Sequence, residues 1–302
     1  WGDFNTIRFP QTRMGVEQVY YNAFTRAKEY EANLKIFAPK NVTLSKKQSK
    51  KITYQPPFIP VRKDIELDVL VEILNQKRFI TCHSYVQSEI NMLMHVADSM
   101  GFKVNTFTHI LEGYKVADKM KTHGVGGSTF SDWWAYKFEV NDAIPYNAAL
   151  LHSMDIVTAI NSDDAEMGRR LNQEAAKAVK YGGVSEEEAL KLVTLNPAKL
   201  LHLDHRMGSI KSGKDADLVI WTGHPLSIYS KAEKTIIDGM IYFDTETDVL
   251  LRKRNEAERV RILQKMNEAK NKGAETQKPK NRKPRQYHCD TLNDEINYDE
   301  EL

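Results

Sequence analysis

Hydrophobic positions along the first third of the chain recur mainly with helical spacing. Apolar residues three and four positions apart predict one long amphipathic helix from Thr12 to about Ile36 and a second over 67–74. Thr12 and Asp64 stand where these helices begin, and both are residue types that cap helix N-termini. Between the helices, residues 39–60 carry KKQSKK and QPPFIP without any periodicity, so we expect an exposed insertion or linker.

From residue 79 the pattern changes to short apolar runs that alternate with helical stretches. The runs predict strands over 79–82, 104–108, 126–130 and 156–160. The stretches between and after them predict helices over 89–100, 113–123, 140–154, 167–181 and 185–195. The run Ile156–Ile160 is rich in β-branched residues, which indicates a strand buried on both faces, as in a parallel sheet. The alternation predicts an α/β fold built from successive strand and helix units.

The last third of the chain follows a different pattern. Strand-like runs in GSIKSGKDADLVIW and KTIIDGMIYFD, with a tight turn at Asp238-Gly239, predict a small β-domain. Residues 248–271 are dense in charge with apolar residues spaced for a surface helix, and from 273 the composition is typical of disorder. We therefore divide the chain into a barrel-like part at 1–205, a β-domain at 206–245 and a charged tail at 246–302.

Composition narrows the classes of function only a little. The chain has 302 residues, 41% of them hydrophobic, and a formal net charge of +2, which does not indicate a nucleic-acid surface. No run is long enough for a membrane span. With only two cysteines, Cys82 and Cys289, a disulfide framework is not expected. The chain begins at Trp1 without a signal region, so a natural N-terminus with any signal peptide would lie upstream, and the cellular compartment stays open.

Three ionisable residues stand where short apolar runs end: His83, His109 and Asp163. A (β/α)8 barrel uses about 30 residues per unit and carries its chemistry at the C-terminal ends of the strands. The spacings correspond to about one unit and two units, which would bring the three side chains to one rim, where they could hold a divalent metal. Each histidine alone is more often structural, and Asp163 or Asp164 could instead cap the following helix.

An aromatic patch, FSDWWAYKFE, follows the third predicted strand. We expect Trp133, Trp134 and Tyr136, with Lys137, to lie on a rim loop that walls a substrate pocket, although packing explains paired tryptophans equally well. The remaining barrel histidines, His95, His123 and His152, fall in or at the ends of helices and are expected to be structural.

Several segments together resemble the metal-dependent amidohydrolase superfamily, in its imidazolonepropionase-like and prolidase-like branch. They are RFPQTRMGVEQ, HSYVQSEI, THILEGYKVADKM, INSDDAEMGRRL and NPAKLLHLDHRMGSIKSGKDADLVIW. The resemblance implies the C-terminal half of a TIM-like (β/α)8 barrel with part of a small β-sandwich. It also implies that His83 on strand five and His109 on strand six bind the more solvent-facing metal. Asp163 on strand eight would bind the other metal and act as general base, with one or two zinc ions and a small-molecule amide or dipeptide as substrate.

The chain departs from the family pattern at the expected first strand. No His-X-His motif is present in the sequence, so we expect the N-terminal half of the barrel and the first half of the β-sandwich to be missing from it. We therefore expect an inactive fragment that either pairs with the missing half or forms a homo-oligomer. The alternative is a catalytically inert amidohydrolase-like module that acts in protein-protein interaction.

Overall fold

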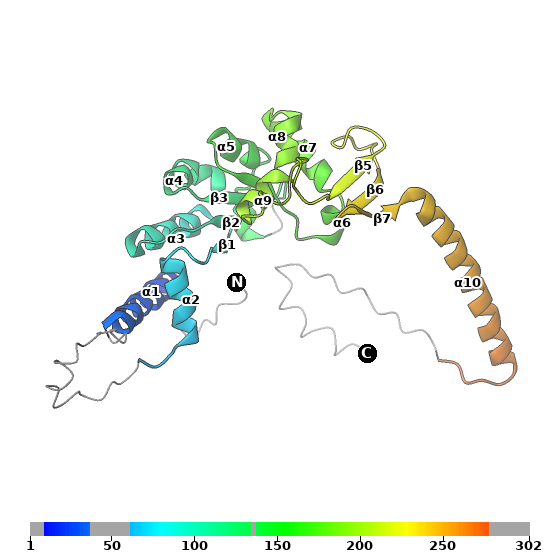
Figure 1. The fold of residues 1–302 in the computed structure, drawn as a ribbon, viewed down its shortest axis with the longest axis horizontal. Helices are drawn as coiled ribbons and strands as arrows, with labels where there is room; N and C mark the ends of the chain where they lie inside the picture. The colour runs from blue at the N-terminus through cyan, green and yellow to red at the C-terminus, as the bar shows by residue number, and fades with distance from the viewer. Residues whose placement is uncertain (1–8, 37–60, 134–136, 278–302) are drawn as a thin grey trace, which may run out of the picture. The chain divides into compact units, whose positions relative to one another are not determined.

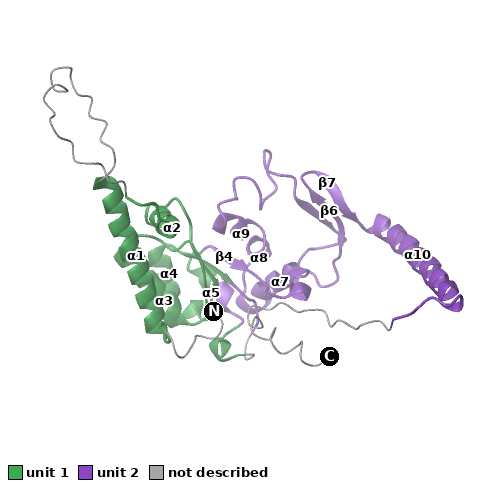
Figure 2. Ribbon diagram, turned by 90° about the horizontal axis from the view of Figure 1, so that it is seen from below, with its two compact units in different colours: residues 1–128, 134–144, 150–156 green, residues 129–133, 145–149, 157–302 purple. Residues whose placement is uncertain are grey.

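The structure, a computed structural model, describes residues 9–36, 61–133 and 137–277 (Figure 1). Contacts divide the chain into two compact units, coloured separately in Figure 2. Unit 1 comprises residues 1–128, 134–144 and 150–156, and unit 2 comprises residues 129–133, 145–149 and 157–302. Each unit is described by itself below.

Unit 1 begins with the two predicted helices, α1 (Arg13–Ile36) and α2 (Ile65–Leu74). Asp64 caps α2, because its carboxylate accepts hydrogen bonds from the backbone N–H groups of Glu66 and Leu67 at 3.0 and 3.1 Å. The Tyr30 hydroxyl of α1 donates to Asp68 of α2 at 2.9 Å. This bond joins the two helices, which are separated in sequence by residues outside the described ranges.

Strand and helix alternate through the rest of unit 1. The elements are β1 (Thr81–Ser84), α3 (Gln87–Met100), β2 (Thr106–His109), the 3-10 helix η2 (Gly113–Val116), α4 (Ala117–His123) and β3 (Gly126–Thr129). Gly101 and Gly124 end α3 and α4 in the left-handed conformation, as the sequence predicts for helix C-termini. Strands β1 and β2 are parallel neighbours, and β3 follows β2 in the sheet. The predicted α/β architecture is confirmed.

The core of unit 1 lies between these helices and the sheet. Phe24 of α1 stacks on Phe102 with ring centroids 4.2 Å apart. Fully buried residues of α3, of β2 with the residue after it, and of α4 complete this core: Ile90, Val96, Phe107, Ile110 and Met120. Burial of such side chains stabilises a fold by about 1.5–3 kcal/mol each, so this core fixes the sheet edge that carries His83 and His109.

The prediction of one helix over 140–154 is wrong in its first half. A short 3-10 helix, η3 (Phe138–Val140), is followed by turns, and α5 spans only Asn147–Ser153. Pro145 explains the difference, since proline lacks a backbone N–H and disfavours helical geometry in the residue before it.

Unit 2 contains β4 (Thr158–Ile160) and four helices after it: α6 (Ala165–Gly168), α7 (Leu171–Gly182), α8 (Glu186–Lys191) and α9 (Leu195–Leu200). The single helix predicted over 167–181 is therefore two helices in the structure. Thr129, the last residue of β3, belongs to this unit, and its carbonyl accepts from the N–H of Asn161 at 3.0 Å. Ala175, Ala189 and Leu192 form the centre of the unit 2 core.

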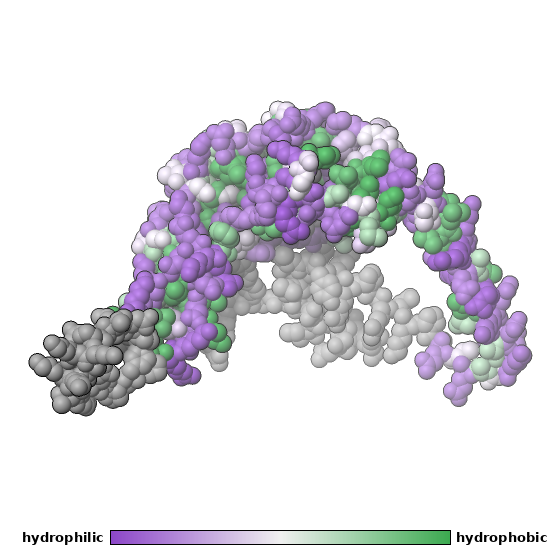
Figure 3. All heavy atoms as spheres, in the orientation of Figure 1, coloured by the Kyte–Doolittle hydropathy of each residue, from purple (hydrophilic) through white to green (hydrophobic). Residues whose placement is uncertain are grey.

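The C-terminal part of unit 2 is an antiparallel sheet of β5 (Leu218–Trp221), β6 (Ala232–Ile237) and β7 (Met240–Asp244). Asp238 and Gly239, with φ of 51° and 78°, form the predicted two-residue turn. Helix α10 (Thr245–Asn271) follows, and no residue of it is buried. Figure 3 shows the apolar surface over β5, β6 and β7. The domain boundaries drawn from sequence remain a prediction.

No helix among the described residues is both long enough and apolar enough to cross a membrane.

Candidate metal centre

His83 and His109 lie side by side at one edge of the parallel sheet. His83 is the third residue of β1 and His109 the last residue of β2, and the strand register pairs Ser84 with His109. The Nε2 atom of His109 is 2.8 Å from Nδ1 of His83, and the ring centroids are 4.7 Å apart. The spacing argument therefore correctly brings these two side chains together at the C-terminal ends of adjacent strands.

The two imidazoles differ in their surroundings. His109 is only 1% exposed, whereas His83 is an exposed residue. His109 also has φ of 76°, a left-handed backbone conformation that costs a non-glycine residue about 1–3 kcal/mol. Such strain persists only where the neighbouring structure holds the residue, so the backbone of His109 is firmly held at the end of its strand.

The pair has the chemistry of half a zinc site. Imidazole nitrogens bind zinc at about 2.0–2.1 Å, so two nitrogens on one tetrahedral ion lie about 3.3 Å apart. The observed separation of 2.8 Å needs only a small movement of one ring to reach that value. Two donors fit a zinc ion but do not complete its coordination. Within the described ranges, no group of three or more His, Cys, Asp or Glu side chains is arranged to hold a metal ion.

Asp163 lies in unit 2, three residues beyond the end of β4, whereas the two histidines lie in unit 1. The structure resolves which of the two adjacent aspartates caps the next helix. The Asp164 carboxylate accepts from the backbone N–H groups of Glu166 and Met167 at 2.8 and 2.9 Å. Asp164 is therefore the N-cap of α6, and the role of Asp163 as ligand and base stays a prediction.

Tyr85 is the neighbour of His109 that sequence reasoning missed. Its ring stacks on the His109 imidazole, with centroids 5.0 Å apart and planes 5° from parallel. The ammonium of Lys137 lies 3.8 Å from the centroid of the Tyr85 ring. The available signal was an aromatic residue two positions after His83, but only the folded strands show which side chain it contacts.

Hydrogen bonds hold the backbone of Tyr85 on both sides. Its N–H donates to the Glu89 carboxylate at 3.3 Å, and its carbonyl accepts from the N–H of Glu112 at 3.2 Å. Glu89 in turn accepts from Arg13 of α1 at 2.6 Å, and this hydrogen bond is the main reason why the pKa of Arg13 is raised. The loops after β1 and β2 are thus tied to each other and to α3 and α1.

Behind the pair, Cys82 points into the core of unit 1. Its Sγ atom is 3.7 Å from the hydroxyl of Ser84, and burial raises the pKa of its thiol. Cys82 is a free, buried cysteine in the structure.

Of the three aromatic residues expected to wall a pocket, the structure describes Trp133. Its ring stacks on Phe130 at 4.5 Å, and its indole N–H donates to the Met167 sulfur at 2.8 Å. Trp134 and Tyr136 lie outside the described residues. Within unit 2, Trp133 is therefore a packed side chain with a fixed orientation, and the role in substrate binding remains a prediction.

A buried ionic network fixes the segment that carries Trp133. Lys177 of α7 bonds to Asp132 at 2.7 Å and to Glu174 at 2.9 Å, and the Ser131 hydroxyl donates to Glu174. Burial lowers the pKa of Lys177, but the hydrogen bonds to Asp132 and Glu174 outweigh burial, so its pKa is raised. The ammonium therefore stays charged and balances the Glu174 carboxylate, which is 7% exposed.

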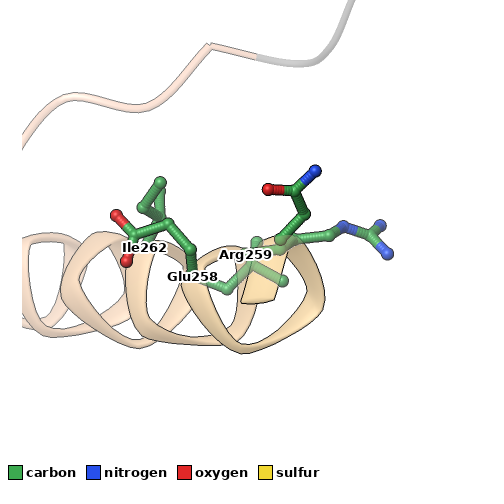
Figure 4. Close-up of a pocket in the computed structure, with 5 residues that line it drawn as sticks. Glu258, Arg259 and Ile262 are labelled. Atoms are coloured by element: carbon green, nitrogen blue, oxygen red, sulfur yellow. The ribbon is translucent and has the colours of Figure 1, made fainter. Parts of the chain in front are cut away.

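A surface hollow on α10 has no features of a binding site. Its lining residues are Asn255, Glu258, Arg259, Ile262 and Leu263, all from this one exposed helix (Figure 4). Binding sites are concave and enclose a ligand between several elements, so this hollow is a gap between neighbouring side chains.

Comparison with known proteins shows that this chain is similar to amidohydrolases. Residues 140–252 match the model of the amidohydrolase family. An amidohydrolase of Hapsidospora irregularis, tasK, is 25% identical over 240 residues, which cover 78% of this chain and 24% of tasK. Imidazolonepropionase of Thermoplasma volcanium is 30% identical over 135 residues, which cover 44% of this chain and 33% of the enzyme. The chain thus spans between a quarter and a third of these relatives.

A solved structure gives the same assignment. The amidohydrolase of Thermotoga maritima superposes with a TM-score of 0.66 and 28% identity, over 78% of this chain and 57% of that one. The resemblance to the amidohydrolase superfamily and the partial barrel fold that it implies are both confirmed.

Proposed function

We propose that this chain, a relative of the amidohydrolases, contributes metal ligands to an enzyme that hydrolyses a carbon-nitrogen bond in a small-molecule amide, a cyclic amide or a dipeptide. One observation carries the proposal. His83 and His109, from neighbouring strand ends, bring two imidazole nitrogens to 2.8 Å from each other at the edge where such barrels carry out chemistry. The match of residues 140–252 to the amidohydrolase family supports the reaction class.

In this proposal zinc is the expected metal, and Asp163 adds a carboxylate ligand. A bound zinc ion supplies Lewis acidity that acidifies water and polarises the amide carbonyl. Asp163 accepts the proton of the attacking water and returns it to the nitrogen that leaves, as general base and then general acid. Asp164 is excluded from this role because its carboxylate caps α6.

The proposal also gives a role to the three aromatic residues that follow β3. Trp133, Trp134 and Tyr136 would form an aromatic wall against the substrate, and the hydrogen bond from Trp133 to Met167 supports a fixed wall at that residue. Rigid aromatic side chains with one polar group are typical of small-molecule pockets.

We further propose that this chain alone retains metal weakly and has no useful activity. Catalytic zinc sites have three protein ligands as a rule, and the chain would offer only that minimum, with the histidine pair as two ligands and Asp163 as the third. Further ligands would come from additional native sequence or from another chain, either a second copy or a separate barrel half.

A second hypothesis is a catalytically inert amidohydrolase-like module that binds another protein. Exposed apolar side chains on β7 and α10, such as Tyr242 at 69% and Leu250 at 66%, favour this alternative. A chain that is monomeric by light scattering and inactive in every native form would contradict both hypotheses.

The test is hydrolysis of N-acyl amino acids, dipeptides and cyclic amides with and without added zinc, on this chain and on any longer native form. We expect zinc-dependent activity in the longer form, abolished by Asp163→Asn and by His109→Ala. Asp164→Asn is the matched control, because asparagine caps helices as well as aspartate does and should leave activity unchanged. Equal activity of Asp163→Asn and the parent would refute the assignment of the base.

A further inference from the structure

The ring of Tyr85 lies against the face of the His109 imidazole. The Tyr85 ring is 9% exposed and nearly parallel to the imidazole, at a centroid distance of 5.0 Å. Stacked rings at such a distance attract each other beyond the effect of buried area. The imidazole plane of His109 is therefore coupled to the plane of Tyr85.

The Tyr85 ring is itself held in place. Its backbone is fixed by Glu89 on the N–H side and by Glu112 on the carbonyl side, at 3.3 and 3.2 Å. Lys137 adds an attractive cation–π contact, with its ammonium 3.8 Å from the ring centroid. A fixed backbone and a contacted ring leave Tyr85 little freedom to rotate.

Backbone geometry shows why His109 needs such support. Its φ of 76° places the residue in a region that costs free energy, and the hydrogen bond from Ile110 N–H to the Ser84 carbonyl, 2.8 Å long, anchors only the backbone. The orientation of the ring depends on what the ring touches, and its contacts include the edge of His83 and the face of Tyr85.

We infer that Tyr85 is a positioning residue for the metal pair. It holds the His109 imidazole in the plane that directs Nε2 toward His83, and Lys137 keeps the Tyr85 ring in that place. The inference rests on the proposed function for its metal, but the orientation of His109 can be measured without any metal. Groups that orient a ligand in this way change metal affinity by about 10–100-fold when they are removed.

The test compares Tyr85→Leu with Tyr85→Phe in the full chain. Phenylalanine keeps the stacked ring, whereas leucine keeps apolar volume but removes the aromatic plane. Tyr21→Leu is the matched control, because Tyr21 packs against the same core and its hydroxyl bonds to Ser99 on α3. Binding of Co²⁺ is measured by its visible spectrum and by chelator competition, and thermal unfolding reports any general loss of structure.

We expect Tyr85→Leu to weaken Co²⁺ binding at least 10-fold and Tyr85→Phe to change it less than 3-fold. Tyr21→Leu should lower the melting temperature without a change in affinity. A Lys137→Met variant should fall between the parent and Tyr85→Leu. If Tyr85→Leu bound Co²⁺ as tightly as the parent, the positioning role would be overturned, but the proposed metal pair would not be affected.

A measurement on the metal-free protein separates the inference from the proposed function. In ¹⁵N-labelled protein, the hydrogen bond between His83 and His109 should give a slowly exchanging imidazole N–H signal in the parent and in Tyr85→Phe. Loss of this signal in Tyr85→Leu supports the positioning role whether or not the pair binds metal. Parent-like Co²⁺ binding by His109→Ala would refute the metal pair but not the positioning role. An unchanged signal in Tyr85→Leu overturns the positioning role.

Discussion

The Nε2 atom of His109 lies 2.8 Å from Nδ1 of His83, yet one imidazole is buried and the other is exposed. This asymmetry follows from the strand register, which pairs His109 with the buried Ser84 and His83 with the partly exposed Thr108. The two side chains therefore share one proposed function but contribute differently to stability.

Replacing each histidine by alanine should separate these contributions. His109→Ala removes a buried, stacked ring, so we expect the free energy of unfolding to fall by about 1–3 kcal/mol. His83→Ala removes an exposed ring and should change stability by less than about 0.5 kcal/mol. Urea unfolding measures both. If the pair binds metal, both variants should lose Co²⁺ affinity to the same degree despite this difference, and a loss confined to His109→Ala would argue against a shared ion.

The positions of these two histidines could be predicted from sequence because parallel strands repeat at regular intervals. The chain distance between His83 and His109 corresponds to one strand and helix unit, so both reach the same edge of the sheet. The turn at Asp238-Gly239 could also be predicted from sequence, because a two-residue turn with positive φ at both positions favours Asp-Gly.

Other features depend on contacts that no local pattern encodes. Pattern alone could not decide whether Asp163 or Asp164 caps α6, because both aspartates are capping residues and stand side by side. The Tyr85 stack on His109 and the bond from Lys177 to Asp132 join residues far apart in sequence. The helix predicted over 140–154 is the opposite case. Pro145 is a local signal against a continuous helix, but the apolar spacing favours one.

A second prediction concerns His123, which was expected to be structural. It is 4% exposed, its Nε2 accepts from the N–H of Val104 at 3.1 Å, and its Nδ1 lies 2.8 Å from the Asp98 carboxylate. Nδ1 therefore carries the proton in the neutral ring and donates to Asp98. His123→Leu would leave a buried N–H without an acceptor, so stability should fall by about 1–3 kcal/mol.

The control for His123 is Asp98→Asn, which keeps an acceptor oxygen at an exposed position. We expect this variant to lie within about 0.5 kcal/mol of the parent in urea unfolding. If Asp98→Asn proved as damaging as His123→Leu, the ion pair rather than the bond to Val104 would be the stabilising interaction.

A third prediction concerns alkaline pH. Burial raises the pKa of Tyr20 to about 12, and the nearby Cys82 adds to the shift. An unfolded tyrosine loses its proton at about pH 10, so between these values the folded state binds more protons than the unfolded state. The free energy of unfolding should therefore be unaffected by Tyr20 below about pH 10 and fall as the pH rises toward 12.

Tyr20→Phe should remove this part of the pH dependence. Urea unfolding of parent and variant at pH 9 and pH 11 gives the comparison, with the parent losing more stability between the two than Tyr20→Phe. Tyr242→Phe is the control, since its side chain is 69% exposed and the substitution should preserve the parent's profile. Identical profiles for the parent and Tyr20→Phe would contradict the partial burial of Tyr20 that the structure shows.

The final prediction concerns the network that holds the Trp133 segment to α7. Lys177 is the cation shared by Asp132 and Glu174, and Glu174 is 7% exposed and also accepts from Ser131. Lys177→Met leaves the Glu174 carboxylate buried without its counter-charge, which should lower the free energy of unfolding by about 1–3 kcal/mol. Lys177→Arg keeps the charge and should cost less. The double variant Glu174→Gln/Lys177→Met removes both charges, so it should be more stable than Lys177→Met alone. The free energies of urea unfolding of the parent, Glu174→Gln, Lys177→Met and the double variant complete a double-mutant cycle. Strict additivity in this cycle would mean that the two side chains do not interact, and the segment that carries Trp133 would then depend on the Phe130 stack and the Met167 contact instead.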